Sequence, residues 1–167
     1  MGELQISWDQ YHQKIEDLAV CIGRADWSFT HIICLAKGGL RVGDILARIF
    51  DKPLGILVAS SYGDADGKTR GQIKFADHLS SLAAPVGPIL LVDDLADSGV
   101  SLQAAYTWLH DHYPTITELR TATIWVKGHS IVKPDFFVEF LPDNPWICQP
   151  FERYENLSIE NLLCDRP

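Results

Sequence analysis

Three aspartates in one short stretch could bind a sugar and act on it. Asp93 and Asp94 follow the apolar run 89–92, and Asp97 comes three residues later, directly before Ser98. Adjacent carboxylates can accept hydrogen bonds from two neighbouring hydroxyl groups, such as those of a ribose. A solvated strand end or a helix cap explains one acid, but neither explains all three. The stretch therefore indicates a site that recognises a pentose.

A turn of small residues follows the paired acids and is typical of a phosphate site. It runs from Ala96 through Asp97 to Ser101, where a helix is expected to begin. Free backbone N–H groups and the helix dipole attract anions at such a position. Gly99 allows a close approach of the backbone, and Ser98 and Ser101 can add hydroxyl donors, although serine at a helix start is often only a cap. The combination predicts a ribose 5-phosphate pocket with Asp97 at its mouth.

Strands that alternate with helices must position these groups. Helices are expected after Ser7, after the glycine pair 38–39 and after Gly99. This alternation predicts one domain, residues 1–167, of the α/β class, with a mainly parallel, twisted sheet flanked by helices and ligands at the carboxyl ends of its strands. The apolar runs that predict strands are 31–36, 53–62, 87–94, 119–127 and 134–141.

The composition limits the classes of function. The chain has 167 residues and a formal charge of −8, which argues against binding to nucleic acid because phosphate backbones are held mainly by surplus Lys and Arg. No apolar run approaches the roughly 20 residues that span a bilayer, and the start does not resemble a signal peptide, so a cytoplasmic location is expected. The four cysteines lack zinc or redox spacing, and His110 and His112 would point to different sides of a helix. No histidine or cysteine metal site is therefore expected.

The stretch "ILLVDDLADSG" resembles the phosphoribosyl diphosphate signature of the type I phosphoribosyltransferases. In that family apolar residues precede two acids, two variable residues, an Asp or Thr, a Thr or Ser, and a Gly. The resemblance extends over residues 31–151 and is most marked with the 6-oxopurine branch, the hypoxanthine and xanthine-guanine phosphoribosyltransferases. It implies the type I phosphoribosyltransferase fold, with a flexible lid loop at about 62–74 and a small C-terminal hood for the base at about 127–151.

Two further motifs resemble the parts of that family that handle pyrophosphate. "LAKGGL" at 35–40 is similar to its pyrophosphate loop, which implies contacts from Lys37 and Gly38 and a cis peptide bond just before Lys37. A glycine turn after a strand is by itself a common connector. "SSY" at 60–62 resembles the start of the catalytic lid, and Arg70 would then be the lid arginine that contacts pyrophosphate.

The base would be read by residues near the C-terminus. Lys127 matches the lysine that binds the purine 6-oxo group, although an exposed lysine at a strand end is the alternative. "NPWICQPFE" resembles the xanthine-guanine enzymes, which implies that Trp146 covers the purine and that Ile147 offers backbone contacts; plain packing of the tryptophan is the alternative. Those enzymes usually carry an acid where this chain has Cys148. A thiol is a poor acceptor for an exocyclic amine, so the preferred oxopurine stays open.

The resemblance implies transfer of the 5-phosphoribosyl group from phosphoribosyl diphosphate to N9 of guanine, xanthine or hypoxanthine in purine salvage. The products would be a nucleoside monophosphate and pyrophosphate. Asp97 would manage the proton of the base at N7, and Mg²⁺, bound by Asp93 and Asp94 mostly through substrate and water, would neutralise the leaving group. A homo-oligomer, either a dimer or a tetramer, is expected. The residues assigned to substrate binding are Lys37, Gly38, Gly39, Ser61, Tyr62, Arg70, Asp93, Asp94, Ala96, Asp97, Ser98, Gly99, Val100, Ser101, Lys127, Trp146 and Ile147.

Three other functions remain open from the sequence. A phosphoribosyltransferase could act on a different base, such as a pyrimidine, but Lys127 and Trp146 argue against this. A regulator could sense phosphoribosyl diphosphate without catalysis, but it would need a basic surface or a nucleic-acid domain, which this acidic chain does not show. The third is a module that binds a phosphosugar and has no partner base.

Overall fold

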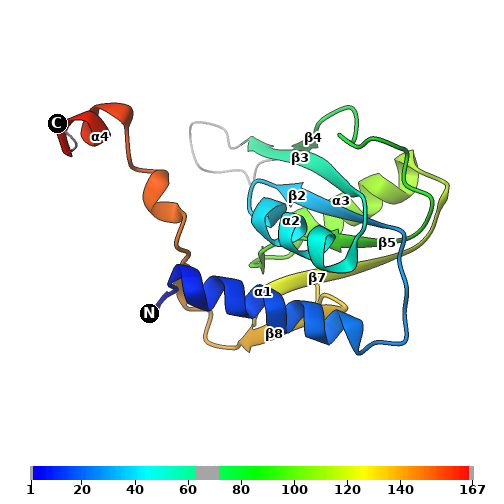
Figure 1. Ribbon diagram of the computed structural model, residues 1–167, viewed down its shortest axis with the longest axis horizontal. Helices are drawn as coiled ribbons and strands as arrows, with labels where there is room; N and C mark the ends of the chain where they lie inside the picture. Colours follow the sequence, from blue (N-terminus) through cyan, green and yellow to red (C-terminus); the bar gives the residue numbers. More distant parts are fainter. Residues whose placement is uncertain (1, 63–71, 166–167) are drawn as a thin grey trace.

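The computed structural model describes residues 2–62 and 72–165, which form a sheet with helices on both faces (Figure 1). Strands alternate with helices along the chain, so the predicted α/β class is confirmed. The elements in chain order are β1 (Glu3–Gln5), α1 (Trp8–Gly23), β2 (His31–Ala36), α2 (Gly39–Phe50), β3 (Leu54–Tyr62), β4 (Gln72–Phe75), β5 (Gly87–Val92), β6 (Leu95–Ala96), α3 (Val100–His112), β7 (Ile116–Lys127), β8 (Phe136–Leu141), β9 (Trp146–Cys148), the 3₁₀ turn η1 (Glu152–Tyr154) and α4 (Ile159–Asp165).

The larger sheet places β5 between β2 and β7. Its strands follow the order β4, β3, β2, β5, β7, β6, and β8 pairs with β7. All of these pairs are parallel except β3 with β4. The strand predicted over 87–94 ends at Val92, so Asp93 and Asp94 lie in the turn beyond it. The carboxyl end of β5 therefore carries the paired acids to the edge where β2 and β7 also end.

Hydrophobic side chains fill both faces of the sheet. Leu90 and Val92 of β5 belong to the cluster under α1 and α2, whereas Ile89 and Leu91 belong to the cluster under α3. Successive side chains of a strand point to opposite faces, and all four are fully buried because helices cover both faces. Figure 1 shows this layered arrangement around the central strands.

The first helix begins at the capping box that the sequence predicts. The Ser7 hydroxyl accepts a hydrogen bond from the Gln10 backbone N–H at 3.2 Å, and the Ser7 N–H donates to the Gln10 side chain at 2.9 Å. This box satisfies two backbone donors and fixes the start of α1, which buries Tyr11 and Ile15 against the sheet. Within residues 2–62 and 72–165, no helix combines the length and apolar character that a membrane span requires.

A small second sheet joins the two ends of the chain. Strand β1 runs parallel to β9, and the Trp146 N–H donates to Gly2 O at 3.1 Å while the Ile6 N–H donates to Cys148 O at 3.0 Å. Neither strand is predicted by the sequence, because each is only three residues long. Beyond β9 the chain continues through η1 to α4, which extends away from the larger sheet (Figure 1). The N-terminal strand thus supports the segment that carries the tryptophan.

Candidate active site

The paired aspartates lie close together in the turn beyond β5. The Asp93 N–H donates to Ala122 O on β7 at 3.0 Å, and the Asp94 N–H donates to the Asp93 carboxylate at 2.9 Å. The Asp94 carboxylate is buried and accepts a 2.6 Å hydrogen bond from the Gln149 side chain. Burial and the adjacent Asp94 charge raise the pKa of Asp93 well above its ordinary value. Two carboxylates this close repel each other, so hydroxyl donors or a cation would stabilise the pair.

The glycine pair before α2 packs directly against these acids. A Cβ added to Gly39 would lie 2.6 Å from Val92 O, and one added to Gly38 would collide with the Asp94 carboxylate. Backbone atoms therefore require glycine at position 39, and a side chain at position 38 would displace the Asp94 carboxylate, which a simple connector would not explain. The peptide bond between Ala36 and Lys37 is cis, as the resemblance implies. The loop "LAKGGL" and the paired acids consequently form one continuous surface.

The small-residue turn leads into α3 as predicted. Gly99 has a positive φ of 76°, and a Cβ there would lie 2.9 Å from the Val132 N–H nitrogen, so conformation and space both require glycine. The Ser98 carbonyl accepts a hydrogen bond from the Ile131 N–H at 2.9 Å. The Ser98 hydroxyl accepts a long hydrogen bond from the Val100 N–H at 3.4 Å, although the N-cap of α3 is Gly99 and no side chain caps the helix. The turn is thus held in place from the segment after β7.

Asp97 contacts two basic side chains. One of its carboxylate oxygens lies 3.2 Å from Lys127 Nζ and 2.8 Å from His129 Nε2. The Asp97 side chain is half exposed, whereas Lys127 is only 6% exposed at the end of β7. The alternative of an exposed lysine at a strand end is therefore wrong. A buried ammonium group needs a partner, and the Asp97 carboxylate provides it.

Trp146 lies beside this group with its ring uncovered. Its side chain is 61% exposed, and Lys127 Nζ lies 5.8 Å from the ring centroid. The neighbouring Ile147 is buried and joins the core, so the strand β9 is anchored at one residue and exposed at the next. The Cys148 thiol donates to the Glu3 carboxylate at 2.7 Å. Trp146 therefore offers an aromatic face next to a cation, and it is not packed as a core side chain.

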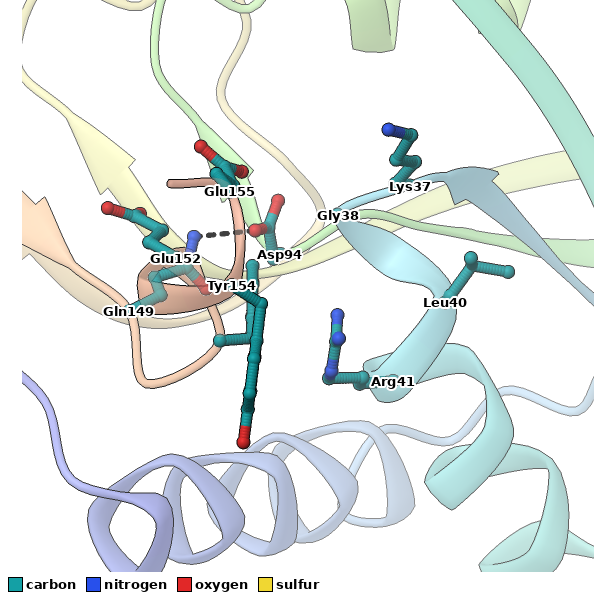
Figure 2. Close-up of a pocket in the computed structure, with 10 residues that line it drawn as sticks. Lys37, Gly38, Leu40, Arg41, Asp94, Gln149, Glu152, Tyr154 and Glu155 are labelled. Carbon is teal, nitrogen blue, oxygen red and sulfur yellow. Dashed lines mark hydrogen bonds between the residues drawn. The ribbon is translucent and has the colours of Figure 1, made fainter. Parts of the chain in front are cut away.

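A cavity of about 450 Å³ opens beside the paired acids. Figure 2 shows Lys37 and Arg41 on one side, Gln149 and Glu152 on the other, and Asp94 between them. The Arg41 guanidinium lies 4.0 Å from the ring centroid of Phe151, which holds it at the wall. A second hollow of about 230 Å³ shares Lys37, Gly38 and Asp94 with the first and reaches Leu35, Ala36, Ala59, Ile73, Asp93 and Ser101. The acids therefore stand between the side of the cavity that carries Lys37 and Arg41 and the side that carries Glu152 and Glu155.

A comparison with known protein families finds a match for most of the chain. A family described as "Phosphoribosyl transferase domain" matches residues 7–156. The chain belongs to the phosphoribosyltransferase family. The xanthine-guanine phosphoribosyltransferase of Ruegeria sp. (strain TM1040) is 30% identical over 155 residues, which cover 88% of this chain and 84% of that protein. This relative places the chain in the 6-oxopurine branch.

Two solved structures share the phosphoribosyltransferase fold of this chain. A purine phosphoribosyltransferase from Pyrococcus horikoshii has a TM-score of 0.75 at 23% identity, covering 90% of this chain and 94% of that one. The xanthine-guanine-hypoxanthine phosphoribosyltransferase of Helicobacter pylori has a TM-score of 0.73 at 22% identity, covering 97% and 99%. The fold implied by the resemblance is therefore confirmed over nearly the whole chain.

The expected lid of this phosphoribosyltransferase is described only at its two ends. Ser61 and Tyr62 end β3, where their backbones pair with Ile73 and Gln72 of β4. Residues 63–71, and with them Arg70, lie outside the described residues. The assignments of Arg70 and of the lid motion remain predictions.

The carboxylates of the paired acids fit a magnesium ion that is held largely by substrate. Among residues 2–62 and 72–165, no three His, Cys, Asp or Glu side chains gather closely enough to hold a metal by themselves. Mg²⁺ prefers oxygen ligands and is commonly bound through one or two carboxylates together with phosphates and water. Asp93 and Asp94 supply such carboxylates beside a cavity large enough for a diphosphate.

Four residues of the site were not predicted from the sequence. Arg41 lies two positions beyond the glycine pair, and Gln149 and Glu152 belong to the stretch "NPWICQPFE", from which only residues 146–148 were interpreted. His129 follows Lys127 by two residues and contacts Asp97. All four lie within a motif or one or two residues beyond it, so their position in the sequence was a usable signal. Their mutual contacts, however, depend on the fold.

Proposed function

We propose that this phosphoribosyltransferase transfers the 5-phosphoribosyl group of phosphoribosyl diphosphate to N9 of a 6-oxopurine. The observation that carries the proposal is the group formed by Asp97, Lys127 and Trp146. Lys127 lies 3.2 Å from the Asp97 carboxylate and 5.8 Å from the centroid of the exposed tryptophan ring. An acid for N7, a cation for the 6-oxo oxygen and an aromatic face for the rings therefore stand together beyond the sugar-binding acids. A pyrimidine has no N7, so it would leave the acid of this group without its partner.

The sugar and its phosphates would occupy the surface beside the base group. The ribose hydroxyls would donate to Asp93 and Asp94, which relieves the repulsion between these carboxylates. The 5-phosphate would accept from the N–H groups of the turn at 98–101. Pyrophosphate would lie in the cavity of Figure 2, where Lys37 and Arg41 supply positive charge. Bound Mg²⁺ would add charge neutralisation for the diphosphate.

The reaction would break the bond from C1 to the pyrophosphate oxygen and form a bond from C1 to N9. Pyrophosphate leaves with the electron pair, and positive charge develops on the sugar in the transition state. Asp97 accepts the proton of the base at N7, which makes N9 a better nucleophile. Lys127 stabilises the negative charge that gathers on the 6-oxo oxygen as this proton leaves. Preorganised charges of this kind lower the barrier without reorganisation during the reaction.

A substrate panel tests this function. The purified protein receives phosphoribosyl diphosphate and Mg²⁺ with guanine, xanthine, hypoxanthine, adenine or orotate, and nucleotides are separated by chromatography. We expect nucleoside monophosphates from the 6-oxopurines and none from orotate. A nucleotide from orotate alone would assign the enzyme to a different base. Calorimetric binding of phosphoribosyl diphosphate without any nucleotide would instead favour a regulator or a phosphosugar module.

We further propose that the enzyme works as a homo-oligomer in the cytoplasm and contributes to purine salvage. The oligomer is an expectation from the resemblance, and light scattering of the purified protein tests it. A monomer in solution would remove this part of the proposal and leave the reaction unaffected.

A further inference from the structure

His129 contacts the carboxylate that the proposed reaction depends on. Its Nε2 lies 2.8 Å from the Asp97 oxygen that Lys127 also contacts. An ionised carboxylate only accepts hydrogen bonds, so an imidazole that carries its proton on Nε2 could donate it to Asp97 at this distance. Two basic side chains thus lie against the same oxygen of Asp97.

The backbone around His129 is fixed by several hydrogen bonds. Its N–H donates to the Asn144 side chain at 3.1 Å, and the Gly128 N–H donates to Leu141 O at 2.9 Å. A Cβ on Gly128 would lie 2.7 Å from Pro142 O, so the chain passes tightly against the segment after β8. These contacts fix the backbone of His129, so the fold places its imidazole near Asp97.

The two basic side chains on Asp97 differ in burial and in their other assignments. In residues 2–62 and 72–165, the basic groups that contact the Asp97 carboxylate are those of Lys127 and His129. Lys127 is only 6% exposed at the end of β7, whereas the His129 side chain is 48% exposed. Lys127 is also assigned to the 6-oxo oxygen of the base, so His129 is the contact of Asp97 that has no other part in the proposed reaction.

We propose that His129 is a positioning residue that orients Asp97 for phosphoribosyl transfer. The proposal rests on the proposed function, because it assigns Asp97 the proton at N7. A donor at the position of Nε2 would hold one carboxylate oxygen and direct the other toward the base. Proton transfer requires the accepting carboxylate to lie within hydrogen-bond reach of the proton that it takes.

The decisive comparison pairs His129→Ala, which removes the donor, with His129→Gln, whose amide can still donate to Asp97. We expect His129→Ala to lower kcat about threefold or more, because a misplaced proton acceptor is less effective. KM for phosphoribosyl diphosphate should change little. His129→Gln should restore most of the lost kcat, and His110→Gln, at another exposed histidine beside an aspartate, should leave kcat unchanged.

A measurement without turnover accompanies the kinetics. Calorimetry measures the affinity of His129→Ala for phosphoribosyl diphosphate, which should stay near the wild-type value, and thermal unfolding checks that the variant is folded. A folded His129→Ala with the wild-type kcat, or a His129→Gln variant as slow as His129→Ala, would overturn the proposal while the transferase assignment stands. A wild-type protein that forms no nucleotide from any base would overturn both.

Discussion

The sugar side of the site, formed by Asp93, Asp94 and the glycine pair 38–39, consists of turns that follow neighbouring strands of one sheet. The base side, formed by Lys127 and Trp146, draws on β7, on β9 and on the N-terminal strand that pairs with β9. The glycine pair on the sugar side is packed tightly, since a single added carbon would meet backbone or carboxylate atoms. The tryptophan on the base side is 61% exposed. The two sides thus differ in packing, although the hydrogen bond from Gln149 to Asp94 links the segment after β9 to the paired acids.

Asp97 stands where the two sides meet, and its loss should have the largest effect. Asp97→Asn keeps the shape of the side chain but removes the proton acceptor, so we expect kcat to fall about 10²–10⁴-fold. The affinity for phosphoribosyl diphosphate, measured by calorimetry, should change little because the paired acids and the phosphate turn remain. Undiminished turnover in this variant would remove Asp97 from the proposed reaction.

Gly39→Ala tests how rigid the sugar side is. The new methyl group would lie 2.6 Å from Val92 O, so the backbone must move. Such overpacking costs about 1–3 kcal/mol of unfolding free energy, and the displaced loop should also weaken binding of phosphoribosyl diphosphate. Thermal unfolding and calorimetry measure the two effects. Gly23→Ala is the matched control, because a Cβ at Gly23 has no atom within 4 Å; similar behaviour of both variants would show that the sugar side is not tightly packed.

Trp146→Ala tests the base side alone. Stacking of a base on an aromatic ring contributes about 1–3 kcal/mol, which corresponds to a rise of roughly 5- to 150-fold in KM for the base. The melting temperature and the affinity for phosphoribosyl diphosphate should stay near their wild-type values, because the ring is mostly exposed. Tyr106→Ala on α3, also an exposed aromatic, is the control. If both variants keep the wild-type KM, the tryptophan does not cover the base.

The same contrast explains how much could be predicted from the sequence. The sugar side lies in unbroken motifs, and its chemistry can be read from residue types because strand, turn and helix follow each other directly. The strand pattern also placed Asp93 and Asp94 at the correct edge, although β5 ends at Val92 and the acids belong to the turn. The order of residues within each motif was enough to predict the sugar side.

The base side depends on contacts between distant residues. The pairing of Glu3 with Trp146 in β1 and β9 joins segments over 140 residues apart, and two strands of three residues carry too weak a pattern to predict. The contact of the buried Lys127 with Asp97 likewise joins two residues that are distant in the sequence. Hydrophobic periodicity reports which face of an element is covered, but it does not report which segment covers it.

The contact between Cys148 and Glu3 gives the prediction with the smallest expected effect. It tests a side-chain contact between β1 and β9, the strand that carries Trp146. The Glu3 carboxylate accepts a hydrogen bond from the thiol and thereby raises the pKa of Cys148, which lowers its thiolate fraction near neutral pH. Glu3→Gln should lower this pKa, so iodoacetamide should alkylate Cys148 faster at a fixed pH, and the rise of rate with pH should begin earlier. Peptide mass spectrometry measures each site, with the exposed Cys21 in the same sample as the reference. An unchanged rate at Cys148 would mean that the Glu3 carboxylate does not hold the thiol in solution, whereas the backbone pairing of β1 with β9 would be unaffected by that result.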